Sequence, residues 1–68
     1  MKVELTCQHD EAVRSEIQRI CVSNHGDIDE NLTKDDVVVC VFDDRNNAIR
    51  ISELFVQAGI VTDIKLVE

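Results

Sequence analysis

The chain has 68 residues, a formal net charge of −7 and only two aromatic side chains, Phe42 and Phe55. This length makes one domain with a small core, which must here be mainly aliphatic. The seven basic residues are scattered, which argues against direct nucleic-acid binding, because phosphate contacts need clustered Lys and Arg. The longest apolar run covers six residues, 37–42, whereas a membrane-spanning helix needs about 20.

The N-terminus and the cysteines indicate the compartment. Glu4 interrupts the N-terminal segment too early for the apolar stretch of a signal peptide. Three cysteines, an odd number without a recognisable spacing, are typical of a reducing compartment rather than of a disulfide scaffold. We therefore expect a cytoplasmic protein.

The first 26 residues predict a strand followed by a helix. Alternation of apolar and polar residues over 2–7 has the period of a half-buried strand. Asp10 is expected to cap the helix, and Gly26 to end it in the left-handed conformation. The apolar stripe of this helix consists of Val13, Ile17, Ile20 and Cys21.

The middle of the chain predicts two strands. Residues 27–33 alternate weakly and favour a short edge strand, with a long loop as the alternative. Residues 37–42 carry the strongest strand signal in the chain and are apolar on both faces.

The last third predicts a helix and a strand. Asp43 and Asp44 are typical of a turn and a helix cap. Gly59 and Ile60 predict a Schellman ending, after which 61–67 alternates as a strand with Asp63 and Lys65 facing outward. The buried helix face is expected to hold Ala48, Ile51, Ser52, Phe55 and Ala58.

The predicted order is β-α-β-β-α-β. Because crossovers are right-handed, both helices should cover one face of a four-stranded sheet. We predict an α+β, two-layer, ferredoxin-like sandwich with strand order 4-1-3-2, in which strands 1 and 3 are parallel neighbours. A three-stranded β-α-β-α-β sheet is the alternative. RNA-recognition motifs and ACT domains resemble this topology, but the chain lacks the exposed aromatics of the former and the glycine-containing first turn of the latter.

Parallel strands 1 and 3 would bring several polar residues to one sheet edge, a place where α/β proteins often bind ligands. These residues are Cys7, His9, Asp10, Asp43, Asp44 and Asn46. The three aspartates could hold Mg²⁺ there. They could equally cap the two helices and favour their positive ends, which is the interpretation that we prefer.

Cysteine and histidine do not predict a metal site. The pairs Cys7/His9 and Cys21/His25 should lie at opposite ends of the first helix, about 20 Å apart, so that they cannot share one zinc ion. Cys7, Cys21 and Cys40 fall on apolar stripes, where free cysteine is a small hydrophobe. With two glycines and no nucleophile motif, the chain also lacks the signature of an enzyme, and we expect no cofactor.

The apolar strand 37–42 must expose one of its faces, because a two-layer fold covers only the other. Leaving Phe42 in water would forfeit the most burial, so Val37, Val39 and Val41 are expected to face outward. A row of valines on an open sheet face favours a homodimer, with a loosely covered strand of a monomer as the alternative.

Acidic residues are concentrated in positions 27–44, which hold seven acids and one lysine. We call this segment the acidic stretch; its acids are Asp27, Asp29, Glu30, Asp35, Asp36, Asp43 and Asp44. It could be a solvated edge that prevents strand pairing, a docking surface for a basic protein, or an imitation of nucleic acid.

Together these features predict a small, non-catalytic protein-interaction or regulatory domain. It would form a homodimer through the open sheet face and would bind a protein with a basic surface at an acidic edge. One alternative is an acidic, nucleic-acid-mimicking inhibitor of the kind found in phages and mobile elements. The other is a regulator that binds a small ligand or a metal ion.

Overall fold

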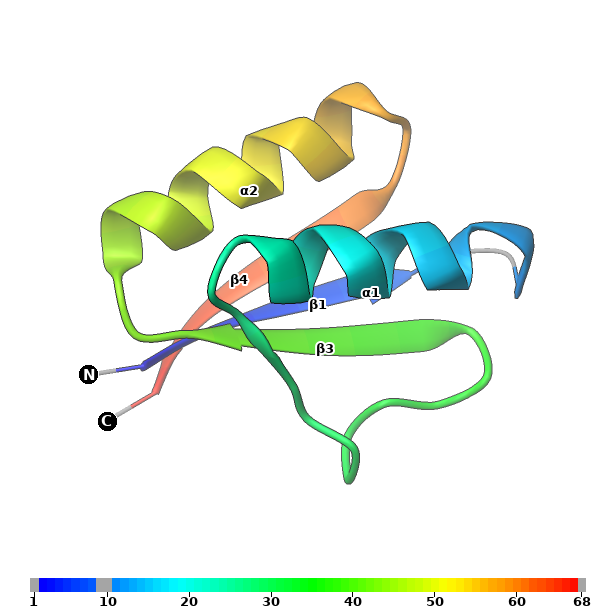
Figure 1. The fold of residues 1–68 in the computed structure, drawn as a ribbon, viewed down its shortest axis with the longest axis horizontal. Helices are drawn as coiled ribbons and strands as arrows, with labels where there is room; N and C mark the ends of the chain where they lie inside the picture. The colour runs from blue at the N-terminus through cyan, green and yellow to red at the C-terminus, as the bar shows by residue number, and fades with distance from the viewer. Residues whose placement is uncertain (1, 9–10, 68) are drawn as a thin grey trace.

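The computed structural model describes residues 2–8 and 11–67 and contains an antiparallel sheet covered on one face by two helices (Figure 1). The strands lie in the order β2-β3-β1-β4. This arrangement confirms the α+β, sheet-plus-two-helices architecture. The elements are β1 (Lys2–Gln8), a 3₁₀ turn (Glu11–Val13), α1 (Arg14–Ser23), β2 (Asp27–Ile28), β3 (Val37–Phe42), α2 (Arg45–Gln57) and β4 (Val61–Val67).

Neighbouring strands run antiparallel throughout the sheet. Val3 lies opposite Phe42, and Gln8 lies opposite Val37. The predicted parallel pairing of strands 1 and 3 is therefore wrong. The reason is topological: the crossover through α1 leaves β2 pointing the same way as β1, and the chain then reverses into β3.

The edge strand predicted over 27–33 forms only at Asp27 and Ile28. Beyond them, one carboxylate oxygen of Asp29 accepts hydrogen bonds from the backbone N–H groups of Asn31 (3.0 Å) and Leu32 (3.2 Å). This local turn competes with strand pairing, as aspartate side chains often do. Residues 27–33 alternate as a strand would, but the turn closed by the side chain of Asp29 ends the pairing of β2 with β3.

The core lies between the helices and the sheet, and β3 contributes Val38, Cys40 and Phe42 to it. This confirms which face of β3 points inward. Ala48, Ile51, Ser52 and Phe55 of α2 are buried as predicted, whereas Ala58 is exposed. The other core residues are Val3, Leu5, Cys7, Ile17 and Cys21.

Both helices end in Schellman motifs. After α2, Ile60 N–H donates to the carbonyl of Phe55 (2.9 Å), and Gly59 takes the left-handed conformation with φ of 84°. After α1, Gly26 N–H donates to Cys21 (2.9 Å), but the left-handed residue is His25, with φ of 68°. The predicted left-handed role of Gly26 is therefore wrong. The Asp10 cap at the start of α1 lies outside the described residues.

Candidate functional site

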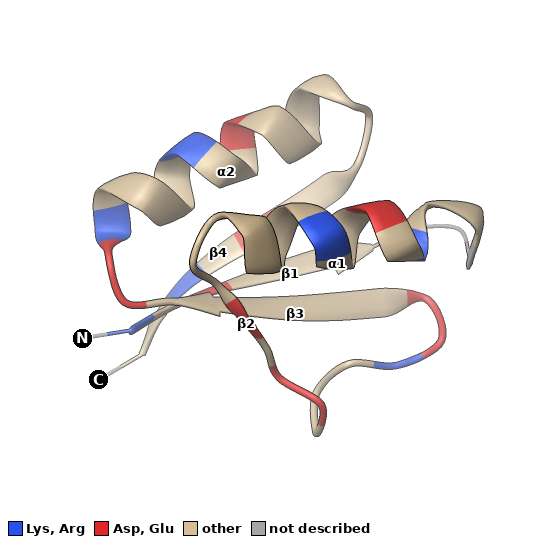
Figure 2. Ribbon diagram, in the orientation of Figure 1, with Lys and Arg blue, Asp and Glu red and all other residues tan. Residues whose placement is uncertain are grey.

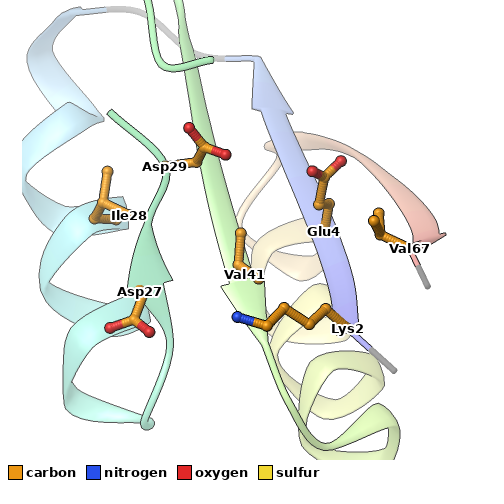
Figure 3. Close-up of a pocket in the computed structure, with 7 residues that line it drawn as sticks. All are labelled: Lys2, Glu4, Asp27, Ile28, Asp29, Val41 and Val67. Atoms are coloured by element: carbon orange, nitrogen blue, oxygen red, sulfur yellow. The ribbon is translucent and has the colours of Figure 1, made fainter. Parts of the chain in front are cut away.

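A groove of about 270 Å³ lies on the sheet face that the helices leave open (Figure 3). Residues of all four strands line it, together with the first residue after β2. Figure 3 shows acidic side chains on both sides of Val41. The side chain of Lys2 lies below Val41 in this view. The lining residues are Lys2, Glu4, Asp27, Ile28, Asp29, Val41 and Val67.

Strand pairing fixes the centre of this groove. Val41 lies opposite Glu4 of β1 on one side and opposite Asp27 of β2 on the other. Directly opposed residues in antiparallel strands have Cβ atoms about 4.5–5.5 Å apart and point to the same face. Two carboxylates therefore flank one half-buried valine, and a third, on Asp29, lies two residues after Asp27.

The electrostatics of the groove are dominated by these carboxylates. Among residues 2–8 and 11–67, the ion pair within 4 Å is Glu16–Arg19 on α1, so Glu4, Asp27 and Asp29 have no such partner there. Arg19 lowers the pKa of Glu16 by hydrogen bonding to it. In the groove, one oxygen of Asp29 is used in the local turn, whereas Asp27 has an exposed side chain. The β2 side of the open face is consequently acidic.

The acidic stretch does not form one surface. Figure 2 shows its acids in three places: along β2 and the following loop, before β3, and after β3. Asp35 and Asp36 precede β3 while Asp43 and Asp44 follow it, and six strand residues separate them, which is roughly 20 Å. The structure thus brings Asp27 and Asp29 to the groove and leaves the exposed Glu30 in the loop beyond it.

Asp44 is a helix cap. One of its carboxylate oxygens accepts hydrogen bonds from the N–H groups of Asn46 (2.9 Å) and Asn47 (3.3 Å) at the start of α2. This confirms the capping interpretation for Asp44. The ligand edge formed by strands 1 and 3 is wrong in its premise, because the antiparallel register places Cys7 opposite Val38, far from Asp43. His9 and Asp10 lie outside the described residues.

The open-face valines differ in exposure. Val37 and Val41 are half-buried, but Val39 is only 3% exposed. The chain after β2 runs alongside Val39: Asp29 N–H donates to its carbonyl (2.9 Å), and its own N–H donates to the hydroxyl of Thr33 (3.1 Å). Self-association through this face stays a prediction, with Val37 and Val41 as its accessible residues.

The three thiols belong to one core, to which β1, α1 and β3 contribute one each. Cys7, Cys21 and Cys40 are all buried and free, which confirms that they are core residues. The thiol of Cys40, on β3, neighbours the thiols of both Cys21 and Cys7. The predicted separation of the Cys7/His9 and Cys21/His25 pairs stays a prediction, because His9 lies outside the described residues. The neighbouring thiol of Cys21 first, then that of Cys7 and burial, raise the pKa of Cys40. Within the described ranges, no cluster of three or more His, Cys, Asp or Glu side chains is placed to hold a metal ion.

Lys2 and Glu4 are the charged groove residues that sequence reasoning missed, and Ile28 and Val67 are the apolar ones. The period-2 spacing of Lys2 and Glu4 placed them on the face of strand 1 opposite the core, but their position next to Val41 depends on the register with β3. In the antiparallel register, Glu4 of β1 and Asp27 of β2 lie on the two sides of Val41.

Comparison of the chain with family models, with curated proteins and with solved structures finds no match in any of the three. Neither α1 nor α2, the helices of the described part of the chain, is long and apolar enough to cross a membrane.

Proposed function

We propose that this domain is a non-catalytic protein-interaction module that binds a basic segment of a partner protein in the open-face groove. The observation that carries the proposal is the row Glu4–Val41–Asp27, in which two carboxylates flank a valine across three strands. Lysine and arginine have the complementary form: an apolar stem that can lie on Val41 and a cationic head that can reach a carboxylate.

The charge of the whole chain supports the same partner. At −7, the domain attracts cationic surfaces before contact, and such steering raises association rates. Asp35, Asp36 and Asp43 are exposed away from the groove and contribute to this long-range attraction. Only Glu4, Asp27 and Asp29 would contact the basic segment.

We further propose that the fold is ferredoxin-like and that the domain works in the cytoplasm. The fold assignment is supported by the strand order, which counted from the β4 edge is 4-1-3-2, and by two helices on one face (Figure 1). The compartment is supported by the three free thiols, since disulfides are rare where thiols are kept reduced.

The test uses a short unstructured peptide rich in Lys and Arg, titrated into isotope-labelled protein and followed by amide chemical shifts. Shifts should concentrate at Glu4, Val41, Asp27 and Asp29. Asp27→Asn should weaken binding several-fold, while Asp35→Asn removes the same charge at an exposed site outside the groove and should have a smaller effect. An acetyl-lysine version of the peptide provides the neutral control.

If Asp27→Asn and Asp35→Asn lose the same affinity for the peptide, binding depends only on net charge. That result would contradict a groove-specific site. Capture of a partner from the host, followed by competition with DNA and RNA, examines the inhibitor alternative. Competition for the same partner surface would favour nucleic-acid mimicry, whereas binding unaffected by nucleic acid favours ordinary docking.

A further inference from the structure

Strand β4 forms one edge of the sheet, and β2 forms the other. Strand β4 runs over seven residues, Val61–Val67, and pairs with β1 on one side. An edge strand presents a row of backbone N–H and C=O groups that can pair with another strand. β2 forms the other edge over only two residues, so β4 is the edge that offers a full-length ladder.

The side chains of β4 that point toward the helix layer are poorly covered. Ile64 lies opposite Leu5, and Leu66 lies opposite Val3. Leu5 and Val3 are buried core residues, yet Ile64 and Leu66 are each 49% exposed. The helix layer therefore stops short of the β4 edge and leaves two large aliphatic side chains half in water.

Helix α2 extends this apolar margin. Its residues Asn47 and Arg50 donate hydrogen bonds to Asn24 at the end of α1, which identifies the flank that faces α1. Ile49 and Val56, two helical turns apart, lie on the opposite flank and are exposed. Ile49, Val56, Ile64 and Leu66 form what we call the β4 margin.

We propose that the β4 margin binds a second copy of this chain by antiparallel pairing of β4 with β4 about a two-fold axis at Ile64. The sequence of β4 is complementary to itself in this register. Ile64 meets Ile64 of the second copy, Val61 meets Val67, and Thr62 meets Leu66. On the open face, Asp63 of each copy meets Lys65 of the other, which forms two cross-strand pairs of opposite charge.

Charge selects this register over its neighbours. Moving the axis by one residue toward the N-terminus places Asp63 opposite Asp63, and moving it by one toward the C-terminus places Lys65 opposite Lys65. Like charges directly opposed are destabilising, whereas opposite charges contribute favourably. The same two residues that blunt the edge against unrelated strands therefore permit one arrangement of two copies.

The resulting dimer has a continuous eight-stranded sheet with all helices on one face, because directly opposed residues share a face. The α2 helices of the two copies become neighbours along Ile49 and Val56. The β2 edges remain at the two outer ends of the sheet, so the carboxylates of Asp27 and Asp29 stay away from the dimer seam, and the seam shares only Val67 with the groove lining. This inference accordingly stands or fails independently of the proposed function.

The test is a charge exchange followed by analytical ultracentrifugation. Wild type should show a concentration-dependent dimer. Asp63→Lys and Lys65→Asp should each weaken self-association about tenfold or more, since both symmetry-related pairs become repulsive. An equimolar mixture of the two variants should associate again, because every Lys then faces an Asp. The double variant D63K/K65D keeps the wild-type net charge and should also dimerise.

Circular dichroism and thermal unfolding check that each variant is folded, and the mixture itself controls for changes in net charge. A wild type that is monomeric at high micromolar concentration would overturn the proposal. So would single variants that dimerise like wild type, or a mixture that fails to restore association. Dimers that survive the charge exchange and are lost with Val41→Lys would place the interface on the open sheet face.

Discussion

Gly26 is packed so closely that an added methyl group should reduce the stability of the fold. A Cβ atom there would lie 2.7 Å from Cε1 of Phe42 and 2.8 Å from the sulfur of Cys21. Phe42 and Cys21 are both fully buried, so neither can move into solvent. Forcing an extra carbon into a packed core costs about 1–3 kcal/mol. The clash, and not backbone conformation, requires glycine here, because the left-handed residue of this turn is His25.

We expect Gly26→Ala to reduce the free energy of unfolding by about 2 kcal/mol, a large share of the roughly 3–10 kcal/mol typical of a domain this small. Thermal unfolding should then shift downward by roughly 8–16 °C. Urea unfolding measures the free energy directly. In a Phe42→Leu background, which removes the outer ring carbons, Gly26→Ala should cost less. A loss below about 0.5 kcal/mol, or an equal loss in both backgrounds, would refute the clash.

Substitutions at His25, at the valines of β3 and at Cys40 test three other parts of the structure. His25→Gly should raise the free energy of unfolding by up to about 1 kcal/mol, because it relieves a left-handed non-glycine residue; an unchanged urea midpoint would contradict this. Val39→Lys should destabilise the fold by several kcal/mol, because it buries an unpaired charge at a 3% exposed site, whereas Val41→Lys should leave unfolding nearly unchanged and weaken binding of the basic peptide. Since the pKa of Cys40 is raised in the folded state, the free energy of unfolding should fall above the pKa of an unfolded thiol, about 8.5. Urea unfolding between pH 7 and 10 measures this fall. The fall should be shallower for Cys40→Ala.

The sequence predicted the elements well because their signals are local. The alternation in β1, the Asp44 cap and the Gly59–Ile60 ending all depend on residues within one or two turns of one another, and the structure confirms each of them. The inward face of β3 was also predictable, because burying Phe42 outweighs burying a valine.

Strand direction and thiol proximity were not predictable in the same way, because both depend on residues distant in sequence. The spacing of Cys7 and Cys21 along the chain does not reveal that Cys40, which lies on β3, neighbours both of their thiols in the core. Likewise, Glu4 and Asp27 meet Val41 only once the antiparallel register is known. The burial of Val39 required a third element, the chain around Thr33.

The two proposed surfaces divide the charges of the sheet between them. The row through Val41 continues from Glu4 to Lys65 of β4, so acid predominates near β2 and a balanced Asp63–Lys65 pair lies at the far edge. A basic peptide is attracted to the acidic side near β2 and meets no net charge at the β4 edge. Another copy of β4, by contrast, finds complementary charges only at the β4 edge. Asp27→Asn should therefore leave the dimer intact, and the mixture of Asp63→Lys with Lys65→Asp should still bind the peptide. Each surface can be removed without the other, because Asp27 lies on β2 whereas Asp63 and Lys65 lie on β4, at opposite edges of one sheet.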